Sequence, residues 1–193
     1  PEADFDDGSC TYPDNGDYSL SFDGYWYNDS TNYVDIASLP LDDLNRTINF
    51  SFKAFDTGTA YQGNIFGTPA DGINANWMEI KRSGDGFELR VGFSATGPFL
   101  YWDTDYVYEF DRWYEVNVEY LNSGQINLII DGENSLLENG VQSGSFNSFS
   151  NHIQLGRFDG ILDNFKIENQ DDLVAHYKFN AGSGDTLYDH SGN

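Results

Sequence analysis

The chain has 193 residues, of which 32 are acidic and 9 are basic, and its formal net charge is −23. Such a charge repels the phosphate backbone of nucleic acids and the anionic headgroups of membranes, so binding to either is disfavoured. Neutral glycans, basic surfaces and divalent cations are the partners that this charge leaves open. The sequence has no run of about 18 apolar residues, which argues against membrane insertion.

Residues 1–17 are acidic and rich in turn-forming residues, without the apolar alternation of a strand. This composition predicts a linker or the tail of a preceding module. The segment contains Cys10, the single cysteine of the chain, so no intrachain disulfide is possible. A lone cysteine in an exported-looking chain predicts a partner outside this sequence, and we expect flanking modules in the same polypeptide.

Apolar and polar residues alternate in the three segments that follow, at 18–23, 33–36 and 48–54. A period of two predicts β-strands. Between the first two segments, Tyr25, Trp26 and Tyr27 are consecutive. Successive side chains of an extended chain point to opposite faces, so we expect at least one of these rings at the surface.

Further strands are predicted at 64–67, 76–81 and 87–93, with the short glycine-containing connections typical of a β-sandwich. Residues 99–110 differ, because aromatic rings and carboxylates mix there without a clear period. This mixture predicts a loop over a binding surface. Trp102, Asp103 and Asp105 lie in it, and Trp77 on a preceding strand is a further candidate.

Residues 112–133 contain two predicted strands and the turn between them. Apolar residues of one face alternate with polar residues on both sides of this turn: Val116, Val118, Tyr120, Ile126, Leu128 and Ile130. This pattern predicts a β-hairpin with one solvated face. No long segment shows the 3.6-residue period of a helix, so the apolar face must pack against a second sheet.

The last predicted strands lie at 152–156, 160–167 and 174–179. In the second of them, Ile161, Asp163, Phe165 and Ile167 fall on one face. A carboxylate in phase with the core requires hydrogen-bond donors or a cation beside it. Asp163 is therefore the acidic residue whose position is most informative.

Seven segments of the chain together resemble a known fold family. In chain order they read DYSLSFDG, NYVDI, TINFSFKAF, RWYEVNVEY, IIDGE, LGRF and GILDNFKI. Over residues 18–168 this order is similar to laminin-G-like domains of the concanavalin A-like lectin/glucanase superfamily, in secreted multidomain proteins of bacteria. The resemblance implies an all-β fold, a two-sheet antiparallel jelly-roll β-sandwich.

The predicted domain organisation is a linker or preceding module at 1–17 and the sandwich at 18–193. Residues 172–193 resemble the opening strand and turn that such bacterial modules carry at their N-terminus. They are therefore either the closing strand of this domain or the start of a following module.

Saccharide recognition needs aromatic rings that stack on the C–H faces of sugars, beside carboxylates that accept hydrogen bonds from hydroxyl groups. The residues that supply this combination are Tyr25, Trp26, Tyr27, Trp77, Trp102, Asp103 and Asp105. The alternative is that these rings fill or cap the core. For Trp113, which matches the structural tryptophan of the family, we expect burial.

Calcium is the cofactor that the resemblance implies, and hard oxygen ligands are plentiful in this chain. The resemblance points to Asp163 as a ligand. Asp23 and Asp189 are further candidates because they lie beside glycine-containing turns. The alternative for these two residues is that each caps a turn.

Catalysis is not predicted. Glu109, Asp111 and Glu115 are spaced by two and then four residues, which differs from the acidic motif of the glycoside hydrolases of this superfamily. A retaining hydrolase also needs two carboxyl groups about 5–5.5 Å apart. The sequence therefore favours an extracellular or cell-surface module that binds a glycan or glycoconjugate, or acts in adhesion, with calcium support. The alternatives are a polysaccharide-active hydrolase or lyase domain and a structural spacer.

Overall fold

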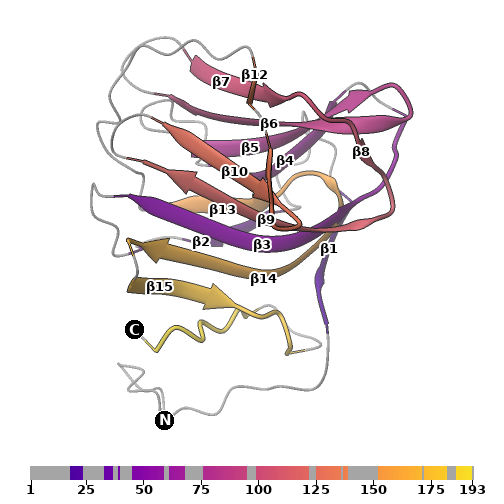
Figure 1. The fold of residues 1–193 in the computed structure, drawn as a ribbon. Helices are drawn as coiled ribbons and strands as arrows, with labels where there is room; N and C mark the ends of the chain where they lie inside the picture. Colours follow the sequence, from indigo (N-terminus) through magenta and orange to yellow (C-terminus); the bar gives the residue numbers. More distant parts are fainter. Residues whose placement is uncertain are drawn as a thin grey trace.

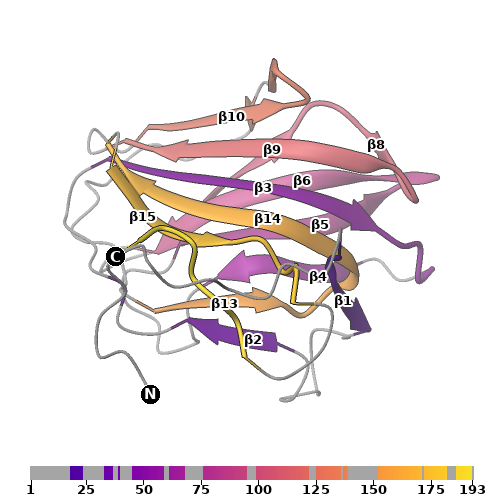
Figure 2. The same ribbon diagram turned by 90° about the horizontal axis from the view of Figure 1, so that it is seen from below.

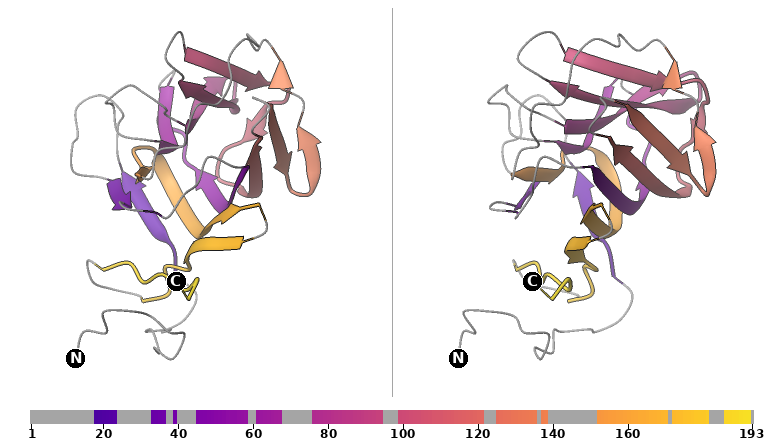
Figure 3. Two further views of the ribbon diagram at one scale, coloured as in Figure 1. Left: turned by 90° about the vertical axis from the view of Figure 1, so that its left-hand side faces the viewer. Right: turned by 60° about the vertical axis from the view of Figure 1, so that its left-hand side comes forward.

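The computed structural model describes the following residues, to which every structural statement below is confined: 18–23, 33–36, 39, 45–58, 61–67, 76–94, 99–121, 125–135, 137–138, 152–170, 172–181 and 186–192. They form two antiparallel β-sheets that pack face to face, as Figure 1 and the side views of Figure 3 show. No helix in this part of the chain is long and apolar enough to cross a membrane.

One sheet has seven strands. It consists of β1 (Leu20–Asp23), β3 (Arg46–Ala54), β9 (Trp113–Tyr120), β10 (Ile126–Ile130), β11 (Glu133–Ser135), β14 (Asp159–Asn169) and β15 (Asp172–Tyr177). Its spatial order is β1-β14-β3-β9-β10-β11, and β15 also pairs with β14. Figure 2 shows β14, β3, β9 and β10 side by side in this layer.

The other sheet has eight strands. It consists of β2 (Tyr33–Ile36), β4 (Tyr61–Gly67), β5 (Asn76–Ser83), β6 (Gly86–Ser94), β7 (Phe99–Thr104), β8 (Tyr108–Glu109), β12 (Leu137–Glu138) and β13 (Ile153–Gly156). Its spatial order is β12-β7-β6-β5-β4-β13-β2, and β8 pairs with one end of β6.

The core lies between the sheets and consists largely of aromatic rings. Every second residue of β3 is buried, and the Phe50 ring centroid lies 5.9 Å from those of Phe52, Phe66 and Phe165. Phe66 comes from the opposite sheet, so these contacts join the two layers. The predicted two-sheet sandwich is confirmed, because the alternating apolar face of the β9–β10 hairpin is buried against a second sheet.

Residues 99–110 contradict their prediction as a loop. Most of this segment forms β7 and β8, and on β7 the exposed Tyr101 and partly exposed Asp103 alternate with the buried Trp102 and Thr104. Aromatic side chains occupy both faces of this strand, which conceals the period of two from a reading of hydrophobicity.

Trp113 also differs from expectation, since its side chain is 43% exposed and points away from the core. The next residue, Tyr114, is buried in its place. The centroid of its ring lies 5.8 Å from the ring centroid of Phe52 and 5.9 Å from that of Phe87. A strand buries alternate residues, so only one of these two neighbours can enter the core.

Strand β14 contains a β-bulge that changes which residues face the core. The register with β3 shifts between Asp163 and Lys166, and Asn164 has a positive φ of 51°. Leu162 is buried before the bulge and Phe165 after it. Asp163 therefore points to the outer face, and its expected position in phase with the core is wrong.

The bulge also divides the edge of the seven-stranded sheet between two strands. Residues 159–162 of β14 pair with β1, and residues 165–169 pair with β15. The start of β1 and the end of β15 thus meet beside the bulge, and Figure 1 shows β15 along this edge. Strand β15 belongs to this sheet, while the predicted division of the chain, at residue 17 and for residues 172–193, stays a prediction.

His176 of β15 connects the strand to the bulge. Its Nε2 atom donates a hydrogen bond to Asn164 Oδ1 at 2.8 Å. Burial, together with the charges of Lys166 and Lys178, lowers the pKa of His176 to about 4. The ring is therefore neutral at pH 7. In this form Nε2 carries the proton that it donates to the Asn164 amide oxygen, and Nδ1 can act as an acceptor.

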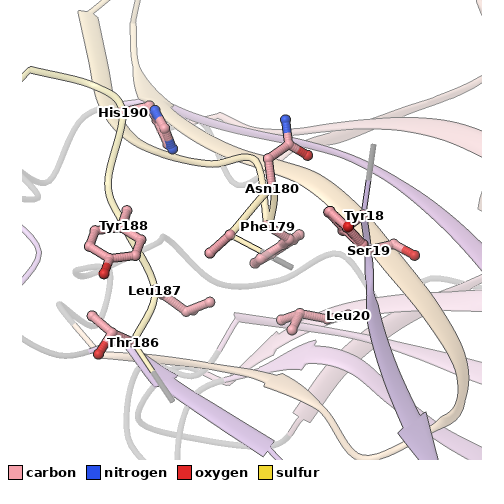
Figure 4. Close-up of a pocket in the computed structure, with 10 residues that line it drawn as sticks. Tyr18, Ser19, Leu20, Phe179, Asn180, Thr186, Leu187, Tyr188 and His190 are labelled. Atoms are coloured by element: carbon pink, nitrogen blue, oxygen red, sulfur yellow. The ribbon is translucent and has the colours of Figure 1, made fainter. Parts of the chain in front are cut away.

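A small pocket of about 170 Å³ lies where the two strand ends meet. Figure 4 shows Leu20 on the segment of β1 facing Phe179 and Leu187 on the C-terminal segment. Leu20 and Leu187 pack against the core, and Phe179 is 9% exposed. The pocket thus lies between two packed segments, and polar side chains such as Ser19, Asn180 and His190 line it together with the apolar ones.

A tight corner joins β4 to the start of β14. Asn64 N donates to Arg157 O at 3.2 Å, and Gly63 forms a β-bridge with Phe158. Gly63 has a φ of 102°, and a Cβ atom there would lie 1.8 Å from Arg157 O. Only glycine fits this approach of two backbones.

Candidate ligand-binding face

The outer face of the eight-stranded sheet carries an aromatic side chain between two glycines. On β5, Met78 is buried in the core, and successive side chains of a strand point to opposite faces. Trp77, the residue before it, therefore points outward. Trp77 pairs with Gly67 of β4 on one side and with Gly92 of β6 on the other. Neither glycine adds a side chain beside the partly exposed Trp77 ring, and both glycines are buried.

The row continues across the sheet in both directions. Gly92 pairs with Tyr101 of β7, whose side chain is 41% exposed, and Gly67 pairs with Gln154 of β13. Strands lie about 4.8 Å apart, so the Trp77 and Tyr101 backbones are separated by roughly 10 Å. We call these five residues, from Gln154 to Tyr101, the aromatic row.

A charged network lies beside the aromatic row on the same face. Arg90 donates from Nε to Asp103 Oδ1 at 2.5 Å and from Nη2 to Asp103 Oδ2 at 3.0 Å. Its Nη1 atom donates to Glu79 Oε1 at 3.2 Å. The guanidinium also stacks on Tyr101, with 4.3 Å between Cζ and the ring centroid. The paired fork fixes Arg90, and Arg90 in turn fixes the Tyr101 ring.

The two carboxylates that bind Arg90 differ in their electrostatic environment. Burial raises the pKa of Glu79, and the charge of Arg90 offsets this only in part. Burial also acts to raise the pKa of Asp103, but the hydrogen bonds and charges of Arg90 and Lys81 outweigh it and the pKa falls. Lys81 Nζ lies 3.3 Å from Asp103 Oδ2. Asp103 therefore holds its negative charge most firmly, as a fixed hydrogen-bond acceptor.

The structure brings together some of the binding residues predicted from the sequence. Trp77 and Asp103 lie on this one face, and Asp105 is exposed in the turn after β7. Trp102 is only 6% exposed and points into the core, so it cannot offer a ring face to a ligand here. The three aromatic residues at 25–27 lie outside the described residues.

Tyr101, Arg90 and the two glycines escaped the sequence analysis. The alternation of Tyr101 and Asp103 with Trp102 could have revealed that Tyr101 faces outward. No local pattern could have placed Gly67 and Gly92 beside Trp77, because that depends on the register between three strands.

The predicted calcium ligands are dispersed along the seven-stranded sheet. Asp189 Oδ1 accepts hydrogen bonds from His176 N at 2.8 Å and Ser191 N at 2.9 Å, as a turn cap does. Asp163 Oδ1 accepts one from Asn164 N at 2.7 Å. Asp23 lies at the end of β1. Within the described ranges no three acidic, histidine or cysteine side chains are grouped as metal ligands, and calcium stays a prediction.

Asp23 does pair with a second carboxylate, Asp159, across β1 and β14. Burial and the charge of Asp23 raise the pKa of Asp159. When folding raises the pKa of a carboxyl group, the folded protein loses stability as the pH rises from the unfolded pKa through the folded pKa. We therefore expect Asp159→Asn to raise the melting temperature at pH 7 in chelator by about 1–2 °C, a small effect because solvent screens this pair. The gain should vanish near pH 3, and a melting scan at both pH values measures it.

Asp172→Asn, at an exposed position that starts β15, is the matched control and should leave the melting temperature unchanged at both pH values. A lower melting temperature for Asp159→Asn at pH 7 would contradict the repulsion. Repeating the scan with calcium tests the predicted cofactor, because an ion at this carboxylate pair would stabilise the original chain more than the variant.

No family model and no curated protein matches this sequence. Solved structures do match its fold. A heptameric SAP-like pentraxin from Limulus polyphemus is 17% identical with a TM-score of 0.57, covering 77% of this chain and 74% of that one. Domains LG4-5 of the mouse laminin alpha1 chain are 14% identical with a TM-score of 0.54, covering 89% of this chain and 45% of that one.

A third match is domain 4 of AbnA, a GH43 extracellular arabinanase from Geobacillus stearothermophilus, in complex with arabinotriose. It is 13% identical with a TM-score of 0.50, covering 75% of this chain and 67% of that one. Identities this low establish the fold alone. The chain has the concanavalin A-like lectin/glucanase fold shared with pentraxins and laminin G domains, as the resemblance in its sequence implies.

Proposed function

We propose that this chain is a carbohydrate-recognition module that binds a neutral glycan across the aromatic row. The observation that carries the proposal is the placement of Trp77 between Gly67 and Gly92, with Tyr101 on the same face. The axial C–H groups of a sugar ring stack on an aromatic face, and the flanking glycines add no side chain beside the Trp77 ring.

The charged network supplies the polar half of the site. Arg90, held by Asp103, presses against Tyr101 and keeps its ring oriented before a ligand arrives. Preorganised groups bind more tightly because less conformational entropy is lost on binding. The Gln154 amide at the far end of the row donates hydrogen bonds to sugar hydroxyls and accepts them. Asp103, held by Arg90 and Lys81, keeps the network in place.

The solved domain of the arabinanase, in complex with arabinotriose, supports the proposal at the level of the fold, since it pairs the same architecture with an oligosaccharide. The module acts outside the cell or at its surface, where glycans and glycoconjugates are the abundant neutral ligands. The strong negative charge of the chain fits a neutral glycan better than an acidic one.

Hydrolysis is not part of the proposal. Glu109 lies on β8 of the eight-stranded sheet, whereas Glu115 lies on the outer face of β9 in the seven-stranded sheet. The turn residue Asp111 lies between them in the chain. Two carboxyl groups on different sheets do not flank one glycosidic bond.

Trp77→Ala tests the proposal in a titration against a panel of neutral oligosaccharides, followed by calorimetry. Loss of the stacking ring should weaken binding at the aromatic row at least about tenfold, equivalent to about 1.4 kcal/mol. Tyr106→Ala removes a ring that is 59% exposed outside the row, and serves as the control that binds like the original chain. Equal affinity of the Trp77 variant and the original chain would refute the assignment.

A further inference from the structure

The opposite side of the sandwich carries a second hollow, on the outer face of the seven-stranded sheet. This groove has a volume of about 520 Å³ and is lined by Tyr18, Ser19, Ser51, Trp113, Tyr114, Glu115, Asp131 and Asp163. Its volume falls within the range of small-ligand sites. None of these residues belongs to the aromatic row, which lies on the other sheet.

The strand register explains why the surface is hollow here. Asp163 of β14, Ser51 of β3 and Glu115 of β9 pair in one row across three strands. The central side chain is a small serine, whereas the adjacent outward positions of β3 are the longer Lys53 and Asn49. Two carboxylates therefore face each other across a low floor, with their backbones roughly 10 Å apart.

Aromatic rings stand at the rim of this floor. Trp113 is 43% exposed and Tyr18 is 44% exposed. Trp113 lies two residues before Glu115 on the same face of β9, and Lys53 Nζ lies 5.6 Å from the Trp113 ring centroid. An exposed ring beside acceptors is the combination that recognises a sugar face and its hydroxyls.

The charges around the groove indicate a neutral ligand. Asp131 is occupied, because it accepts hydrogen bonds from Glu115 N at 3.0 Å and from Arg112 Nη2 at 2.8 Å. Lys53 and Arg112 offset part of the negative charge of the three carboxylates. Within the described part of the chain, the Glu115 carboxylate makes no side-chain hydrogen bond, so it is available to accept one from a hydroxyl group.

We propose that this groove is a second glycan-binding site, which takes a short neutral saccharide with a ring against Trp113 and hydroxyls toward Glu115 and Asp163. The class of ligand rests on the proposed function, while the site is separate in space and in residues. Because the two sites lie on opposite outer faces of one sandwich, the module is bivalent and bridges two glycan chains.

The experiment is an NMR titration of the ¹⁵N-labelled chain with arabinotriose, xylotriose, cellotriose and maltotriose as probes. Saccharide binding should shift two separate groups of backbone amides, one around Ser51 and Glu115 and one around Gly92 and Tyr101. Glu115→Gln and Trp113→Ala should each raise the dissociation constant fitted from the shifts around Ser51 and Glu115 at least about tenfold. Neither should change the constant fitted from the shifts around Gly92 and Tyr101. Trp77→Ala should do the reverse.

Glu119→Gln is the matched control, since it makes the same substitution four residues further along the outer face of β9 and outside the groove. Shifts confined to the aromatic row would overturn the second site and leave the proposed function standing. Shifts confined to the groove would uphold the groove and refute the row. If no probe shifts either group, both proposals fall.

Bivalence has its own readout. The original chain should make a solution of a neutral polysaccharide turbid by cross-linking it, whereas each single-site variant should bind without cross-linking. Undiminished turbidity with Glu115→Gln and with Trp113→Ala would refute the bridging role of the groove.

Discussion

Replacing Gly63 by alanine should destabilise the fold by about 3–5 kcal/mol, as measured by urea or thermal unfolding. The added Cβ atom would lie 1.8 Å from Arg157 O, 2.9 Å from Arg157 C and 3.1 Å from Phe158 Cα. All three are backbone atoms, so no flexible side chain can move away. Relief would require β4 to separate from the start of β14, where Asn64 N donates to Arg157 O.

Two other glycines serve as controls that measure the cost of a positive φ without a steric clash. Gly58 and Gly84 have positive φ values of 73° and 60°, and a Cβ atom at either would meet nothing within 4 Å. Alanine there should cost only about 1 kcal/mol, the strain of a positive φ. If Gly63→Ala costs no more than these two controls, the corner relaxes freely and does not fix the two sheets.

The second large effect is expected for Arg90→Met, which removes the guanidinium and retains most of the side-chain volume. Asp103 and Glu79, with side chains 15% and 13% exposed, would lose their principal partner. Leaving Glu79 without its ion-pair partner and Asp103 with Lys81 alone should cost about 2–3 kcal/mol at pH 7. Binding at the aromatic row should also weaken, because Tyr101 loses the cation that orients it.

The cost of Arg90→Met depends on pH in a defined direction. Arg90 and Lys81 lower the pKa of Asp103, so their contribution to stability is present above the unfolded pKa and is lost as the pH falls through the folded pKa. The difference between variant and original chain should therefore narrow from pH 7 to pH 3 in chemical denaturation.

Arg112→Met provides the matched control. Arg112 pairs with Asp131 at 2.8 Å, but its side chain is 53% exposed, so its loss should cost less than about 1 kcal/mol. A double variant that combines Arg90→Met with Asp103→Asn should recover part of the stability that Arg90→Met alone loses. If Arg90→Met and Arg112→Met lower the free energy of unfolding equally, solvent screens the ion pairs of Arg90 with Asp103 and Glu79 as it screens any surface ion pair.

The sandwich could be predicted because its evidence is local. The alternation in β9 and β10 lies within a single hairpin, and one solvated face demands a partner for the other. The same reasoning failed at Asp163, where a bulge of one residue reverses the phase of β14. It failed again at Trp113, expected to be buried, because two adjacent aromatic residues give no phase on their own; for Trp102 the core position is the alternative left open by the sequence.

The candidate sites could be predicted only in part. Aromatic and acidic composition identified Trp77 and Asp103, but Gly67 and Gly92 gain their meaning only as neighbours of Trp77 across the ladder. The groove is a stronger example, since Ser51 is unremarkable until β14 and β9 place carboxylates on both sides of it. Register between distant strands is set by the packing of the whole core, which no short pattern contains.

The divided edge of β14 has a mechanical consequence. Tension on the two ends of the domain acts on the start of β1 and, through Asp189 and His190 bonded to His176, on the end of β15, which meet beside Asn164. The load therefore acts at one margin of the sheet, where separating β1 and β15 from β14 also pulls Phe22 and Tyr177 out of the core. Under traction this margin should open first, so the groove, which Tyr18 and Asp163 line, would lose a wall, whereas the aromatic row on the opposite sheet would keep its shape.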